Sequence, residues 1–156
     1  MNNMLTIIIP CKNEGDGILN VIKELEGRYK IIIADSSDDN ITRNLLKDFT
    51  KTNKYIKIVD GGLPSVARNN GAKYVTTPYI LFLDADIYLK DKSIIPECLK
   101  QIATKELVTI KFTTFEPEYR WVYTIFNQIQ KFTALTKPFA LGGFRSEEHT
   151  SELQSR

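Results

Sequence analysis

One stretch, from Tyr79 to Asp86, constrains the fold of this 156-residue chain more than any other. It reads Tyr-Ile-Leu-Phe-Leu-Asp-Ala-Asp, a continuous apolar run that begins after Pro78 and ends in carboxylates. Such a run is typical of a strand in a parallel sheet that helices cover on both faces. Residues two apart on an extended chain point the same way, so Asp84 and Asp86 are expected to face one cation or ligand beyond the strand. An acidic turn that only ends the strand is the alternative.

The same order of apolar run, polar turn and helix-like stretch occurs three times before this strand. The runs cover residues 5–9, 30–34 and 55–59, and Asp60-Gly61-Gly62 turns the chain after the third. Apolar residues at helical spacing follow each run. A β-α-β-α-β-α-β order requires right-handed crossovers and a mostly parallel sheet with helices on both faces. The sequence therefore predicts an α/β domain with a Rossmann-like sheet.

Beyond residue 86 the pattern becomes less regular. It predicts a helix over 93–103, a strand over 107–115 and a long amphipathic helix over 118–135. We expect this last helix to pack into the core of the domain, and an interfacial or acceptor-binding helix is the alternative.

Composition and charge restrict the classes of function. Twenty-one basic and nineteen acidic residues leave a net charge of +2, which does not predict a nucleic-acid partner. Cys11 and Cys98 lack metal-ligand spacing and are expected to be reduced thiols. The chain start lacks a secretory signal, and no apolar stretch has the length of a membrane span. We expect a cytoplasmic protein whose only membrane contact is peripheral, at the inner face.

The end of the chain differs in character from the rest. Residues 145–156 are polar, have no apolar period and resemble the translation of a sequencing adapter. We therefore expect a domain over 1–144, incomplete at its C-terminal end, followed by a non-native disordered tail over 145–156. Glu147, Glu148 and Glu152 belong to that tail, so they are not expected to be catalytic.

Polar residues follow three of the predicted strands. Asn13 and Glu14 come after the first, Asp35 after the second, and Asp84 and Asp86 after the fourth. The carboxyl ends of parallel strands meet at one edge of a sheet, so these side chains are expected to line one crevice. The first loop is not Gly-x-Gly-x-x-Gly, and no Gly-Lys-Ser/Thr loop occurs. Neither a dinucleotide-binding fold nor a P-loop NTPase is therefore predicted.

Three segments, in order, resemble the motifs of the family 2 glycosyltransferases. They are Thr-Ile-Ile-Ile-Pro-Cys-Lys-Asn-Glu at 6–14, Ile-Ile-Ile-Ala-Asp-Ser-Ser-Asp-Asp at 31–39, and Ala-Arg-Asn-Asn-Gly-Ala-Lys at 67–73 followed by 79–86. The likeness is specific up to about residue 87 and looser up to Phe144. Members of this family are inverting enzymes of the GT-A fold that use nucleotide-diphosphate sugars. The resemblance thus implies transfer of a sugar to an acceptor hydroxyl with inversion.

The resemblance also implies nucleotide-binding roles for matching residues. Pro10, Asn13 and Glu14 would shape the nucleotide pocket, and Arg68 and Asn69 would lie beside the nucleotide and its phosphates. Many members have two consecutive acids after the second strand, whereas this chain has Ser36 in the second position. Asp35, alone or with Asp39, would therefore accept the hydrogen bond from the base.

On the metal side, Asp84 and Asp86 would form the DXD motif of the family. Asp84 would lie at the ribose and the metal. Asp86 would bind a Mg²⁺ or Mn²⁺ ion that bridges the two phosphates and stabilises the leaving group.

Inversion also needs a general base that deprotonates the acceptor hydroxyl. The acceptor would be a saccharide, a lipid phosphate or a protein. In the family this base lies beyond a segment like Gly142-Gly143-Phe144, so we expect it to be missing here. We therefore expect this chain to bind the sugar donor without transferring the sugar efficiently. A non-catalytic nucleotide-sugar binding module and a nucleotidyltransferase are the alternatives, and a purely structural domain is a weaker one.

Overall fold

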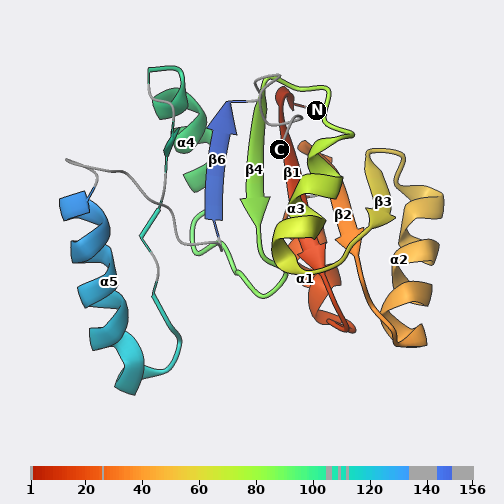
Figure 1. Ribbon diagram of the computed structural model, residues 1–156, viewed down its shortest axis with the longest axis horizontal. Coiled ribbons are helices and arrows are strands. Elements are labelled where there is room, and N and C mark those ends of the chain that lie inside the picture. Colours follow the sequence, from red (N-terminus) through yellow and green to blue (C-terminus); the bar gives the residue numbers. More distant parts are fainter. Residues whose placement is uncertain are drawn as a thin grey trace.

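The protein is described by a computed structural model that covers residues 2–25, 27–104, 107–108, 110–111, 113–133 and 144–148 (Figure 1). Its centre is a six-stranded sheet with the order β3-β2-β1-β4-β6-β5. The first four strands are parallel: β1 (Asn2–Cys11), β2 (Tyr29–Asp35), β3 (Ile56–Asp60) and β4 (Tyr79–Leu83). β6 (Phe144–Glu148) runs antiparallel to β4, and β5 (Leu107–Val108) runs antiparallel to β6.

Helices cover both faces of this sheet. The chain forms α1 (Gly17–Leu25), α2 (Asn40–Thr52), α3 (Pro64–Ala72), α4 (Ile94–Ile102), the short 3₁₀ turn η1 (Pro117–Tyr119) and α5 (Arg120–Thr133). Side chains alternate between the faces of a strand, so each strand contributes to two cores. Ile7, Ile9 and their neighbours pack with α1, α2 and α4, whereas Ile8 and Ile32 pack with α3.

Gly71 lets helix α3 pack directly against Ile8 of β1. A Cβ atom at this position would come within 2.6 Å of Cγ2 of Ile8. The absence of a side chain therefore lets the helix axis approach β1, and this fixes Arg68 one turn earlier over the carboxyl ends of the strands.

The predicted α/β fold is confirmed, including the mostly parallel sheet and the helices on both faces. The strand predicted over 107–115 is largely wrong. Only Leu107 and Val108 are paired, and residues 110–111 and 113–114 form no strand. Two residues with one antiparallel neighbour form a short edge strand.

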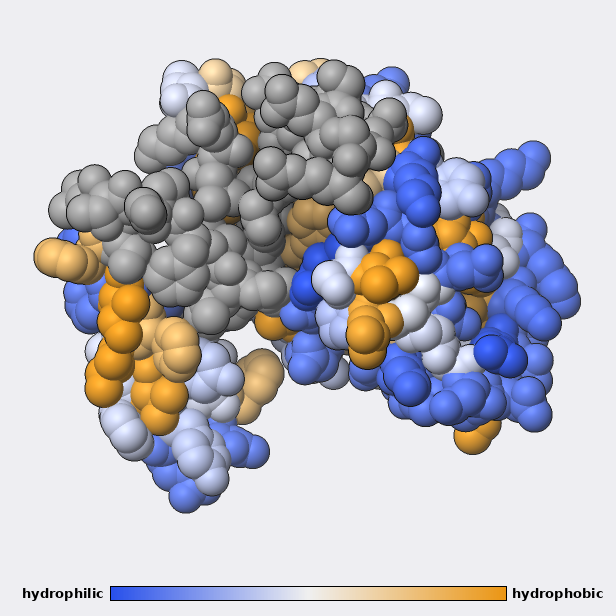
Figure 2. All heavy atoms as spheres, in the orientation of Figure 1, coloured by the Kyte–Doolittle hydropathy of each residue, from blue (hydrophilic) through white to orange (hydrophobic). Residues whose placement is uncertain are grey.

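The prediction of a core helix over 118–135 is also wrong in its packing. Residues 117–133 are helical, and 134–135 lie outside the described residues. However, Trp121 is 65% exposed and Phe132 is 72% exposed. Figure 2 shows hydrophobic residues gathered along α5, at the left of the molecule. Helical periodicity identified the apolar face, but it did not identify what that face contacts.

The predicted tail differs from expectation in one part. Residues 145–148 belong to β6, so the expected disorder does not hold for them, and 149–156 lie outside the described residues. Strand pairing uses backbone groups, so a polar segment can add to the free edge of β4 without an apolar period. The boundary at 144 and the non-native origin of the tail stay predictions.

Among the described residues, no helix combines the length and the apolar character that crossing a bilayer requires.

Candidate functional site

The carboxyl ends of the parallel strands form the candidate site. Cys11 at the end of β1 pairs with Asp35 at the end of β2, which in turn pairs with Asp60 at the end of β3. β4 lies on the other side of β1, with Ile8 opposite Phe82. This register brings the loop after β1, Asp35 and the acidic turn after β4 to the same edge, where α/β sheets bind ligands.

Arg68 and Asp84 form an ion pair across this edge. Nη2 of Arg68 donates a hydrogen bond to Oδ1 of Asp84 at 2.7 Å, and their side chains are 22% and 32% exposed. Burial raises the pKa of Asp84, the guanidinium of Arg68 opposes this rise, and the nearby Asp86 carboxylate adds to it. Arg68 therefore holds the Asp84 carboxylate in one orientation at the sheet edge.

Asp86 and Glu14 are neighbouring acids at the same edge of the sheet. Asp86 is exposed and makes no hydrogen bond or ion pair within the part of the chain that the structure describes. Burial and then the charge of Asp86 raise the pKa of Glu14. A cation placed between two neighbouring carboxylates offsets the repulsion between their charges.

Asp35 is half-buried at the end of β2, and its Oδ1 accepts a hydrogen bond from the backbone N–H of Ser37 at 3.0 Å. Burial, followed by the charges of Asp35 and Glu14, raises the pKa of the Cys11 thiol to about 12. Cys11 is thus a neutral, buried wall of the site. Cys98 is likewise a free, buried thiol.

Asn13 joins the two loops that carry Glu14 and Asp35. Its Nδ2 donates to Oδ1 of Asp38 at 2.6 Å, and its Oδ1 accepts from the backbone N–H groups of Asp38 and Asp39 at 3.0 and 3.3 Å. The backbone N–H of Asn13 also donates to Oγ of Ser37. The sequence predicted a nucleotide contact here but not this link, which only the proximity of the two loops creates.

Asp39 has a structural task that the sequence analysis left open. It is the N-cap of α2, and its two carboxylate oxygens accept from the N–H and the Oγ1–H of Thr42 at 2.6 and 2.9 Å. Ser36 donates to the carbonyl of Cys11 at 3.2 Å. Asp35 is thus the acid after β2 whose carboxylate lies at the sheet edge without a capping task.

The Asn13 link gives a testable stability difference. Asn13 has a φ of 57°, which asparagine and glycine tolerate and alanine does not. Asn13→Gly and Asn13→Ala both remove the side-chain hydrogen bonds, but only alanine adds backbone strain. We expect the alanine variant to be less stable than the glycine variant by about 1 kcal/mol in urea unfolding. Equal unfolding free energies for the two variants would contradict this account.

Two other predicted residues take no part in the contacts described so far. Pro10 is partly exposed in β1 and pairs with Ala34. Asn69 is exposed, and its side chain makes no hydrogen bond to any residue in the described ranges. Asn69 is therefore available to a ligand beside Arg68.

The ligand atoms that this site offers suit a hard divalent cation. The described residues contain no group of three or more metal-ligating side chains. Asp84 and Asp86 supply carboxylate oxygens, and Mg²⁺ or Mn²⁺ commonly binds one or two carboxylates together with substrate phosphates. The residues present therefore fit a cation that the ligand helps to hold, rather than one held by the protein alone.

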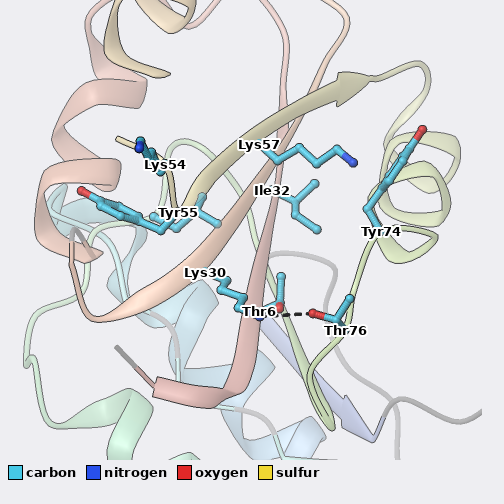
Figure 3. Close-up of a pocket in the computed structure, with 9 residues that line it drawn as sticks. Thr6, Lys30, Ile32, Lys54, Tyr55, Lys57, Tyr74 and Thr76 are labelled. Carbon is cyan, nitrogen blue, oxygen red and sulfur yellow. Dashed lines mark hydrogen bonds between the residues drawn. The ribbon is translucent and has the colours of Figure 1, made fainter. Parts of the chain in front are cut away.

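A separate cavity of about 320 Å³ lies at the opposite, amino-terminal end of the strands (Figure 3). Three lysines line it, and Nζ of Lys57 lies 3.6 Å from the centre of the Tyr74 ring. Nζ of Lys30 donates to Oγ1 of Thr76 at 3.2 Å. No carboxylate from the described part of the chain lines this cavity, so those residues do not offer it the cation ligands of the candidate site.

Comparison with known sequences decides the family. The model of glycosyl transferase family 2 matches residues 6–146, which is most of the chain. The chain belongs to glycosyl transferase family 2. The match contains every residue discussed at the sheet edge. It confirms the resemblance predicted from the three motif segments.

Individual family relatives are distant. The teichoic acid poly(glycerol phosphate) polymerase of Staphylococcus epidermidis is 29% identical over 127 residues, which cover 75% of this chain and 18% of the polymerase. This glycosyltransferase-family chain thus corresponds to a small part of that relative's length.

Solved structures share the fold. The Pyrobaculum calidifontis mannosyltransferase PcManGT, solved with GDP-Man and Mn²⁺, is 17% identical and has a TM-score of 0.67 over 95% of this chain and 45% of its own. The glucosyl-3-phosphoglycerate synthase of Mycobacterium tuberculosis, solved with Mn²⁺, UDP-Glc and phosphoglyceric acid, is 16% identical. Its TM-score is 0.62, over 95% of this chain and 57% of its own. Both likenesses support the GT-A fold, and this chain spans less than two thirds of either protein.

Proposed function

We propose that this chain binds the donor of a glycosyltransferase, and that this donor is a nucleotide-diphosphate sugar held with Mg²⁺ or Mn²⁺. The reaction is transfer of the sugar to an acceptor hydroxyl with inversion. The single observation that carries the proposal is the convergence of Glu14, Asp35, Asp84 and Asp86 at one sheet edge, with Arg68 paired to Asp84 at 2.7 Å.

The half-buried pair of Arg68 and Asp84 supports separate roles for the two acids of the DXD motif. Arg68 fixes Asp84, which suits contact with a ribose hydroxyl and the edge of the metal site. Asp86 is exposed and has no protein partner among the described residues, so it is the acid free to bind the cation directly.

On the nucleotide side, Asp35 would accept a hydrogen bond from the base, because its Oδ2 is not used by the Ser37 N–H that binds Oδ1. Pro10, Asn13 and Glu14 would form the wall of this pocket, and Asn69 would lie beside the phosphates. The link from Asn13 to Asp38 would keep the two loops at a fixed spacing before the ligand binds.

The chemistry required at the anomeric carbon is departure of the nucleotide diphosphate. The cation would supply charge neutralisation to that leaving group. The relatives' names suggest acceptors of different kinds, including poly(glycerol phosphate) chemistry and phosphoglyceric acid. None of the described residues is proposed as the general base that deprotonates the acceptor hydroxyl. We therefore propose that this chain binds the donor but does not transfer the sugar efficiently.

Isothermal titration tests the proposal. UDP and GDP are titrated in turn into the protein with Mn²⁺, with Mg²⁺ and with EDTA. We expect at least one nucleotide to bind with a divalent cation and to lose that binding in EDTA. Lys57→Ala, which changes the distant lysine-lined cavity, serves as the control and should bind as the unchanged protein does. If neither nucleotide binds in a metal-dependent way, the proposed donor site is incorrect.

A further inference from the structure

Glu14 lies between two residues whose backbone N–H groups are held by buried hydroxyls. The N–H of Gly15 donates to Oγ1 of Thr42 at 2.9 Å. The N–H of Asn13 donates to Oγ of Ser37, also at 2.9 Å. Thr42 and Ser37 are both fully buried. Because these N–H groups are already paired, the loop after β1 offers the candidate site the side chain of Glu14 rather than its own backbone donors.

The hydroxyl of Thr42 is fixed in direction as well as in place. Its Oγ1 donates to Oδ2 of Asp39 at 2.9 Å, which leaves a lone pair to accept the N–H of Gly15. The N–H of Asp39 in turn donates to Oδ1 of Asn13 at 3.3 Å. These hydrogen bonds connect the residues on either side of Glu14 through the N-terminus of α2.

The backbone of this loop needs such contacts. Asn13 has a φ of 57° and Gly15 a φ of 53°, so left-handed residues stand on both sides of Glu14. A left-handed conformation is unfavourable for a residue with a side chain and persists where surrounding contacts hold it. The two hydroxyls lie 24 and 27 residues away along the chain. The conformation at Glu14 therefore depends on the segment from 37 to 42.

Electrostatic repulsion gives these contacts a consequence for the candidate site. Glu14 is half-buried and lies close enough to Asp86 to be affected by its charge. Repulsion between two carboxylates favours movement of the loop away from β4 until a cation offsets it. Hydrogen bonds on both sides of Glu14 oppose that movement. They keep the two acids together before the ligand binds, so binding need not include reordering of the loop.

We propose that Thr42 is a positioning residue of the donor site, whose hydroxyl, together with that of Ser37, holds Glu14 beside Asp86. The proposal rests on the proposed function, because it assigns Glu14 to the binding of the cation and the nucleotide diphosphate. Thr42 is fully buried, so it acts through the backbone of Gly15 and not by contact with the ligand.

Thr42→Val tests the proposal, because valine has nearly the shape of threonine but lacks the hydroxyl. Asp39 keeps its capping bond to the N–H of residue 42, so the start of α2 is preserved. We expect metal-dependent binding of UDP or GDP, measured by calorimetry, to weaken about tenfold, as it does when a residue that orients a metal site is lost. Thr42→Ser keeps a hydroxyl and should recover most of the affinity.

Thr6→Val is the matched control. Thr6 is also a buried threonine, and its Oγ1 is hydrogen-bonded to Oγ1 of Thr77 at 2.8 Å. It pairs with Ile80 near the start of β4, toward the end of the strands opposite the candidate site. Thr6→Val should therefore lose stability in urea unfolding but bind nucleotide as the unchanged protein does. Equal weakening of nucleotide binding in Thr6→Val and Thr42→Val would overturn the proposal, because general destabilisation would then explain both.

A double-mutant cycle shows whether Thr42 acts through Glu14. Glu14→Gln removes the charge that Thr42 is proposed to position, so adding Thr42→Val to it should weaken binding little further. Additive losses in the double variant contradict the proposal. So do an unaltered affinity of Thr42→Val and a failure of Thr42→Ser to recover binding.

Amide hydrogen exchange separates this proposal from the proposed function. It is followed by NMR without nucleotide or metal, and the N–H of Gly15 should exchange faster in Thr42→Val than in Thr6→Val. Equal exchange in these two variants refutes the hold of Thr42 on the loop, whether or not a nucleotide binds. A lack of metal-dependent binding by the unchanged protein instead refutes the proposed function, and with it any role of Thr42 at a donor site.

Discussion

Asp86→Asn is expected to weaken metal-dependent nucleotide binding by at least about tenfold, or ~1.4 kcal/mol. Asparagine keeps the size of the side chain but removes the negative charge that attracts the cation. Asp86 has no hydrogen-bonding or ionic partner among the described residues, so the substitution breaks no contact within the protein. The measurement is the dissociation constant for UDP or GDP with Mn²⁺ by calorimetry.

Asp60→Asn is the control for this experiment. Asp60 is an exposed acid at the end of β3, at the same edge of the sheet, and its substitution changes the net charge by the same amount. A general electrostatic effect would weaken binding in both variants, whereas a metal ligand at residue 86 would affect Asp86→Asn alone. Equal dissociation constants for the two variants would show that Asp86 does not hold the cation.

Asp84 is a less informative target because it is coupled to Arg68. Asp84→Asn removes a carboxylate from the site and also breaks the 2.7 Å ion pair with a half-buried guanidinium. A partly buried charge that loses its partner destabilises its surroundings. Weaker binding in that variant could therefore reflect movement of α3 rather than loss of a metal contact.

The parallel core of the fold was predictable because its signals are local. Four runs rich in β-branched or aromatic residues, each followed by helical spacing, leave few arrangements other than a sheet of crossovers. The acids at 35, 84 and 86 could be assigned to one edge for the same reason. In a parallel sheet the chain direction alone decides at which end a side chain lies.

The contacts within the site were less predictable because they join segments distant in sequence. Asn13 and Asp38 are 25 residues apart, and Arg68 and Asp84 are 16 apart. The sequence indicated that Arg68 lies near a nucleotide, but the hydrogen bond to Asp84 depends on how closely α3 approaches β1. That distance is set by the contact between Gly71 and Ile8. Each residue lies in one of the motif segments, but the motifs do not show that the two meet.

The helix predicted over 93–103 is confirmed as α4. The strand predicted over 107–115 and the packing of the last helix were predicted less well, for a different reason. An amphipathic pattern such as that of α5 gives the direction of its apolar face relative to its own axis, and packing against the core is one of several ways to cover that face. Pairing of β6 with β4 depends on backbone groups, which no pattern of side chains discloses.

Gly61→Ala is expected to reduce the free energy of unfolding by about 2 kcal/mol or more. A Cβ atom at residue 61 would lie 2.6 Å from the backbone carbon of Asp35 and 2.7 Å from the backbone nitrogen of Ser36. These are backbone atoms, so they cannot move aside as the end of a flexible side chain can. The N–H of Gly61 also donates to the carbonyl of Asp35 at 2.8 Å, which keeps the two segments in contact. Urea unfolding measures the loss.

Gly17→Ala is the matched control, because a Cβ there would meet nothing within 4 Å and Gly17 has no positive φ. Its unfolding free energy should stay within about 0.5 kcal/mol of the unchanged protein. The displacement at Gly61 would also move Asp35, so Gly61→Ala should weaken nucleotide binding under conditions in which the protein remains folded. Unaltered stability of Gly61→Ala would mean that the turn after β3 lies farther from Asp35 than 2.6 Å allows, and the base-binding role proposed for Asp35 would lose its structural support.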